Sequence, residues 1–196
     1  MRSIKSKWMV LVLVGIVSMQ TAYAKEETWY WGFKLGGGST GFGGTMGNSY
    51  SSYASNPNYS RLTVASELGF YWPLSNETVL GVASGGAGTS YSSSLVSNLS
   101  QTFGVSLLTA SLMHTFGPEP CVGPYVRADL GFATAYQAGG AALFSTSGDS
   151  GLGFRAGGGF GIALSDETRL MIELTYGTVV KSAGAHYFVF SVGPLF

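Results

Sequence analysis

Six charged residues stand at alternate positions inside segments that are otherwise apolar or rich in glycine. They are Lys34, Glu67, Arg127, Asp129, Arg155 and Glu173. Three of them are cations and three are anions, so the set carries no net charge. A charge removed from water needs a partner, because a buried ion without one is strongly destabilising. These residue types, in equal numbers, predict a network of ion pairs in the interior.

The residues that could support catalysis are few and widely spaced. His114 and His186 are the only histidines of the chain. A general base must lie beside its nucleophile, but Ser191 follows His186 at an odd spacing, which places the two on opposite faces of a strand. The metal-binding patterns His-Glu-x-x-His and Cys-x-x-Cys are absent from the sequence. We therefore expect no enzymatic activity, no metal site and no cofactor.

Cys121 is the only cysteine, so the chain cannot form an internal disulfide. Nothing near it in the sequence lowers the pKa of a thiol. We favour an unreactive thiol in a turn, and a disulfide between two molecules is the alternative.

In the segments that must position these side chains, successive residues alternate between an apolar face and a second face. Trp29, Trp31, Phe33 and Leu35 share one face, and Lys34 belongs to the other. A period of two residues is the signature of a β-strand. The pattern occurs eight times, over residues 28–36, 61–72, 80–85, 102–114, 125–132, 152–162, 170–176 and 187–196. Leu107 and Leu108 break the alternation of the fourth segment, which predicts a β-bulge there.

The N-terminus has the features of a secretory signal peptide. Arg2, Lys5 and Lys7 precede an apolar stretch over residues 9–17, and Ala22-Tyr23-Ala24 is a small-x-small cleavage site. The apolar stretch is much shorter than the ~20 residues of a membrane-spanning helix. We expect cleavage after residue 24, which leaves one domain over residues 25–196.

The composition of that domain favours a lipid-facing surface. It contains seven Lys and Arg against ten Asp and Glu, so it has no basic patch for nucleic acid. Charged residues make up 10% of the chain, against about 25% in soluble domains. No apolar run after residue 24 is long enough for a spanning helix, and only helices and closed barrels satisfy the backbone in lipid. The fold class predicted is all-β, an eight-stranded antiparallel up-and-down transmembrane β-barrel.

The connections between the predicted strands are long and short in turn. Longer ones, rich in Gly, Ser and Asn, cover residues 39–60, 91–100 and 137–150, whereas the connection at 181–185 is short. The remaining connections cover 74–78, 117–124 and 164–168, and the first and last of these read Leu-Ser-Asn-Glu-Thr and Leu-Ser-Asp-Glu-Thr. Outer-membrane barrels have short periplasmic turns and longer external loops. We therefore place both related turns, and both termini of the domain, on the periplasmic side.

The first and last strands carry a resemblance to a known family. The chain begins its first strand with Trp29-Tyr30-Trp31-Gly32 and ends with His186-Tyr-Phe-Val-Phe-Ser-Val-Gly-Pro-Leu-Phe196. Together with the signal peptide, it resembles the small eight-stranded outer-membrane β-barrels, which are the porin-like proteins of the OmpA-membrane-domain and OmpX type. The resemblance implies a Gram-negative outer membrane, lipid as the surroundings, and the barrel-assembly machinery as a partner during insertion. It also implies an assembly signal formed by Phe188, Phe190, Val192 and Phe196. Pro194 departs from the pattern, since an aromatic residue is usual there.

Several functions are compatible with such a barrel. An eight-stranded barrel is just wide enough to be filled by side chains, so we expect the six charges to close the lumen and the role to be structural or one of surface interaction. The alternative is a narrow porin-like channel for small ions or solutes. Tyr50, Tyr53 and Tyr59 in the segment 39–60 also favour an adhesin that binds an extracellular ligand, since such loops make adaptable contacts. A lipid-modifying enzyme has the least support.

Overall fold

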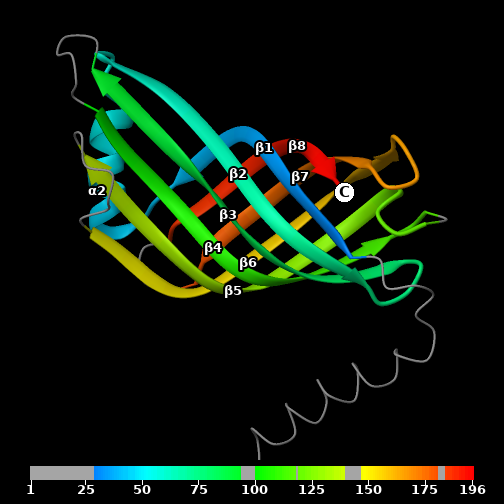
Figure 1. Ribbon diagram of the computed structural model, residues 1–196. Helices are drawn as coiled ribbons and strands as arrows, with labels where there is room; N and C mark the ends of the chain where they lie inside the picture. The colour runs from blue at the N-terminus through cyan, green and yellow to red at the C-terminus, as the bar shows by residue number, and fades with distance from the viewer. Residues whose placement is uncertain (1–28, 94–99, 118, 140–146, 181–183) are drawn as a thin grey trace, which may run out of the picture.

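The computed structural model describes residues 29–93, 100–117, 119–139, 147–180 and 184–196, so the predicted signal peptide lies outside it. Within these residues, eight antiparallel strands form a closed barrel in which β1 pairs with both β2 and β8 (Figure 1). The strands are β1 (Tyr30–Gly41), β2 (Tyr59–Pro73), β3 (Thr78–Ser93), β4 (Ser100–Thr115), β5 (Gly123–Gly139), β6 (Ser147–Ala163), β7 (Arg169–Val179) and β8 (His186–Leu195). The predicted fold class is confirmed.

The alternation of the sequence becomes an inner and an outer surface. In β5, Tyr125, Arg127 and Asp129 are buried in the lumen, whereas Val126 and Leu130 are exposed on the outside. The outer surface carries large apolar side chains on every strand. At mid-height the barrel is therefore apolar outside and charged inside, the reverse of a water-soluble protein. None of the described helices is long and apolar enough to cross a membrane.

The predicted β-bulge in the fourth strand was wrong. Leu107 pairs with Gly85 and Leu108 pairs with Ser84 in an unbroken register. Leu107 points into the lumen and is 3% exposed, whereas Leu108 points outward and is 57% exposed. The two leucines look out of phase in the sequence only because the lumen at this height is apolar rather than polar.

The two related turns have the same hydrogen bonds. The amide of Leu74 donates to the carbonyl of Thr78 at 2.8 Å, and that of Leu164 donates to the carbonyl of Thr168 at 2.9 Å. The hydroxyl oxygens of Ser75 and Ser165 each accept two backbone amides of their own turn. Serine suits this position because its side chain replaces a backbone acceptor in a tight turn. We call the end of the barrel that carries these turns the turn end.

Residues 39–60 do not form the open loop that was expected. β1 continues to Gly41, helix α2 covers Gly44–Ala54, and β2 starts at Tyr59. Figure 1 shows α2 at the end of the barrel that is opposite the C-terminus, which we call the helix end. Gly, Ser, Thr and Asn have low helix propensity, and eleven residues are too few for an isolated helix. Tertiary contacts must therefore stabilise α2.

Those contacts come from one face of α2. Met46 packs against the buried apolar residues of the lumen. Tyr50 contacts Tyr91 and Phe103 with its ring, and its hydroxyl donates to the carbonyl of Thr40 at 2.8 Å. Tyr53 packs on the same two rings. Because two of its tyrosines face the lumen, α2 covers the barrel mouth.

The lumen is filled in three layers. The layer on the helix-end side of the charges is apolar, and it consists of Ala65, Ala87, Val105, Leu107, Ala133, Ala135, Val179, Ala185, Tyr187 and Val189. The layer nearest the turn end is apolar and aromatic, and it consists of Tyr30, Tyr71, Val79, Met113, Cys121, Tyr125, Met171 and Leu195. The six charged residues predicted from the sequence lie on the strands between these two layers.

Candidate functional site

All six charged residues predicted from the sequence lie in the middle layer, and the structure brings them together. Strand pairing explains part of this, because Lys34 of β1 is directly opposite Glu67 of β2, and Asp129 of β5 is opposite Arg155 of β6. The remaining contacts cross the lumen. They exist only because the sheet is closed, which turns the inner faces of distant strands toward one another.

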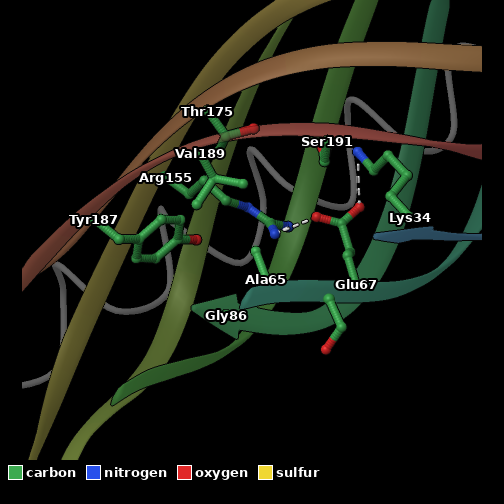
Figure 2. A pocket seen from close by; sticks show the side chains of 10 residues that line it. Lys34, Ala65, Glu67, Gly86, Arg155, Thr175, Tyr187, Val189 and Ser191 are labelled. Carbon is green, nitrogen blue, oxygen red and sulfur yellow. Dashed lines mark hydrogen bonds and ion pairs between the residues drawn. The ribbon is translucent and has the colours of Figure 1, made fainter. Parts of the chain in front are cut away.

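Among the three carboxylates of the described network, Glu67 pairs with the most cations. Its carboxylate lies 3.0 Å from Nζ of Lys34 and 2.6 Å from Nη1 of Arg127, and it also pairs with Arg155. Figure 2 shows the Lys34 and Arg155 side chains approaching this carboxylate from two sides. The hydroxyl of Tyr71 donates to it at 3.0 Å. One carboxylate thus holds cations from three other strands.

Glu173 and Asp129 complete the neutralisation. The carboxylate of Glu173 lies 2.6 Å from Nζ of Lys34 and 3.5 Å from Nη1 of Arg127. Asp129 accepts from Nε of Arg127 at 2.9 Å and also pairs with Arg155. Each of the six groups has at least two oppositely charged neighbours, so this set of described residues has no net charge and no unpaired ion.

Hydroxyl groups that were not predicted as site residues support the ion pairs. Tyr125 donates to Glu173 at 2.8 Å and Thr175 donates to the same carboxylate at 2.6 Å. The hydroxyl of Ser111 accepts from Nε of Arg127 at 3.0 Å. These residues have the same strand parity as the charges beside them, and that parity was the available signal. Further hydrogen bonds are what make a buried ion pair tolerable.

Arg169 was not predicted as a site residue, and it lies at the turn end. Its guanidinium donates to the carbonyl of Pro120 at 3.1 Å and stacks over the ring of Tyr30 at 5.0 Å. Its ion pair with Glu119 is long, at 3.8 Å, and Glu119 is exposed. Arg169 therefore closes the lumen mainly through packing rather than through charge.

Cys121 lies in the turn before β5, with its side chain fully buried. It has a φ of 61°, in the left-handed region that non-glycine residues seldom adopt. Burial raises the pKa of the Cys121 thiol to about 12. A buried thiol that remains protonated is a poor nucleophile.

The two histidines lie at opposite ends of the barrel. His114 is at the turn end, where its ring lies 3.2 Å from the hydroxyl of Thr78 and contacts Phe116. His186 is at the helix end, with its ring 3.0 Å from the carbonyl of Gly184. The structure therefore does not bring these two side chains together.

The residues of the predicted assembly signal belong to β8 and the position after it. Phe188, Phe190 and Phe196 are exposed on the outer surface, and Val192 is half-buried on the same face. In addition, the backbone of Phe196 exchanges two hydrogen bonds with Trp31, which closes the barrel. Their recognition by the assembly machinery stays a prediction.

Comparison with known proteins shows the fold but not a close relative. No protein-family model and no curated protein matches the chain. Among solved structures, neisserial surface protein A (NspA) is 15% identical, with a TM-score of 0.58 over 87% of this chain and 98% of NspA. Ail, the attachment invasion locus protein of Yersinia pestis, in complex with the heparin analogue sucrose octasulfate, is 9% identical, with a TM-score of 0.52 over 86% of this chain and 99% of Ail. The chain has the fold of the small eight-stranded outer-membrane β-barrel proteins.

Proposed function

We propose that the protein is an integral outer-membrane barrel with a closed lumen and a non-enzymatic role, either structural in the envelope or in interactions at the cell surface. The observation that carries the proposal is the three-layer filling of the lumen. An ion that crossed the barrel would have to pass α2 and two apolar layers, and would have to displace the pairs around Glu67. A buried charge that is left without its partner costs about 3–5 kcal/mol.

Outer-membrane placement is supported by the fold and by the outer surface. Apolar side chains form the exterior at mid-height, and tryptophans lie near the turn end, where Trp31 and Trp72 are exposed. Aromatic residues at the water boundary of an apolar band are typical of barrels in lipid. In this placement the turn end faces the periplasm and the helix end faces outward.

Planar-bilayer recordings with the purified barrel test the closed lumen. We expect no stable conductance above that of the bare membrane. Long-lived openings of uniform size with the unaltered protein would refute a closed lumen.

A narrow channel is the second candidate. It is favoured by two cavities of about 20 Å³, both lined by Lys34 and Glu67, because they leave small spaces within the charged layer. In a channel, Glu67→Ala or Arg155→Ala should raise the conductance by removing a side chain from the path. An unchanged current in these variants would argue against transport through this layer.

A role in surface interaction would use the outward face of α2. This face presents uncharged polar side chains, including Thr45, Asn48 and Ser52, while Tyr50 and Tyr53 are turned toward the lumen. Replacement of residues 44–54 by a short Gly-Ser linker should then abolish binding of cells that express the barrel to their target surface. Binding that persists after the replacement would locate the adhesive site elsewhere.

A further inference from the structure

Two small cavities adjoin the ion pair of Lys34 and Glu67. The first lies toward the helix end, and Arg155, Tyr187 and Ser191 are also in its lining (Figure 2). The second lies toward the turn end. Each offers about 20 Å³ to the centre of a water molecule, and one water needs about 10–15 Å³ measured in this way. Each cavity therefore has room for a single water.

Each cavity adjoins a buried polar atom that makes no hydrogen bond within 3.5 Å to another described residue. The hydroxyl of Tyr187 belongs to the helix-end cavity, and Figure 2 shows it directed toward the interior of that cavity. Nη2 of Arg127 belongs to the turn-end cavity. A buried donor that is left unpaired costs about 1–3 kcal/mol, so a small ligand that accepts these hydrogen bonds would stabilise the barrel.

A buried water needs about two to four polar partners in total. Both cavities supply partners besides the unpaired atom. In the helix-end cavity these are the guanidinium of Arg155, which Figure 2 shows beside Tyr187, and the hydroxyls of Thr175 and Ser191. In the turn-end cavity, the carboxylates of Glu67 and Glu173 can accept from a water that itself accepts from Arg127.

We propose that each cavity binds one water molecule as a fixed part of the barrel. The ligand is a water rather than an ion because both cations and anions line each cavity, so an ion of either sign would meet like charges as well as opposite ones. The proposal goes beyond the closed lumen, because a barrel that conducted ions could still hold both waters.

A crystal structure of the barrel at a resolution that shows waters tests the proposal, with crystals soaked separately in sodium bromide and rubidium chloride. We expect one density peak in each cavity, within hydrogen-bond distance of Tyr187 or Arg127, and no anomalous signal at either position. An empty cavity would overturn the proposal. Bromide or rubidium in a cavity would also overturn it, in favour of an ion site.

Two isosteric variants show whether the unpaired hydroxyl holds the water. In Tyr187→Phe, we expect the peak in the helix-end cavity to disappear while the turn-end peak remains as an internal control. Tyr125→Phe is the matched variant, because Tyr125 donates directly to Glu173 rather than into the helix-end cavity; it should keep the helix-end peak. A helix-end water that remains fully occupied in Tyr187→Phe would contradict the role of the hydroxyl.

Discussion

At the scale of single residues, Glu67 is the buried carboxylate that pairs with the most cations among the described residues. Three cations and one tyrosine hydroxyl converge on its carboxylate. Removing one anion from a neutral buried layer leaves its partners with an uncompensated positive charge. The cost of that charge, rather than the strength of any single pair, decides what a substitution does.

Glu67→Gln should therefore destabilise the barrel strongly while keeping its shape. We expect a loss of about 3–5 kcal/mol in the free energy of unfolding, the range found when one partner of a buried pair is removed. Urea unfolding in lipid vesicles measures it. Glu77→Gln in an exposed turn is the control and should stay within about 0.5 kcal/mol. Equal losses in the two variants would show that the buried network does not stabilise the fold.

Cys121 should resist modification at neutral pH, because its thiol is buried and its pKa is raised to about 12. A maleimide at pH 8 should label the folded protein at this position only after unfolding. Glu167→Cys supplies an exposed thiol in a turn as an internal control, and it should react at once. Rapid labelling of Cys121 in the folded barrel would contradict the burial.

The same thiol makes stability depend on pH in the alkaline range. The unfolded thiol loses its proton near the ordinary cysteine pKa of 9.0, whereas the folded one keeps it until about pH 12. The contribution of Cys121 is therefore present below pH 9 and is lost as the pH rises toward 12. In Cys121→Ser, the free energy of unfolding should fall less between these two pH values than in the unaltered chain. An equal fall in the free energy of unfolding in the two proteins would show that Cys121 does not cause this pH dependence.

At the scale of elements, α2 depends on the barrel that it covers. Its sequence has low helix propensity, and Gly43, which precedes it, provides no side-chain cap. A Cβ at Gly47 would collide with the carbonyl oxygen of Phe42, so the start of the helix requires glycine there. Its stability comes from Met46, Tyr50 and Tyr53, which share one face at helical spacing.

Tyr50→Ala should loosen α2 without unfolding the strands. We expect a loss of about 1–3 kcal/mol, smaller than the ~3–5 kcal/mol of a fully buried aromatic residue, together with faster amide exchange over residues 44–54. Hydrogen–deuterium exchange measures the second effect. Ser51→Ala on the exposed face of the same helix should leave the exchange unchanged. Slow exchange in Tyr50→Ala would mean that α2 does not depend on this contact.

At the scale of the whole molecule, the surrounding solvent explains which surface is apolar. Large apolar residues face outward on every strand, and the charged residues of the middle layer face inward. This arrangement is stable only when hydrocarbon surrounds the barrel, because lipid removes the cost of exposed apolar area. The small size of the barrel allows the interior to be filled by side chains.

A charged residue on the outer face should destabilise the barrel more strongly the deeper it lies in the membrane. Leu174→Arg, in the middle of β7, should cost about 2–4 kcal/mol in a bilayer, whereas Leu164→Arg in a turn should cost about 0–1 kcal/mol. Both leucines are exposed in the structure, so loss of packing is similar in the two variants. Unfolding in vesicles measures the difference. Equal costs would mean that lipid does not cover β7.

The strands, the two related turns and the identity of the inward charges could all be predicted from local sequence. A period of two residues assigns each side chain to a face, and a Ser-containing pentapeptide encodes its own turn. Lys34, Glu67 and Arg155 were therefore recognisable as interior residues before any strand pairing was known.

Three other features depend on the closed fold: which charges meet, where the apolar layers lie, and what residues 39–60 form. Glu67 reaches Arg127 because closure of the sheet turns distant inner faces together, and no local pattern encodes that contact. Leu107 looked misplaced because the lumen changes from charged to apolar along a single strand. The helix α2 escaped prediction because its own residues favour a loop, and its folded form is stabilised by rings that belong to β3 and β4.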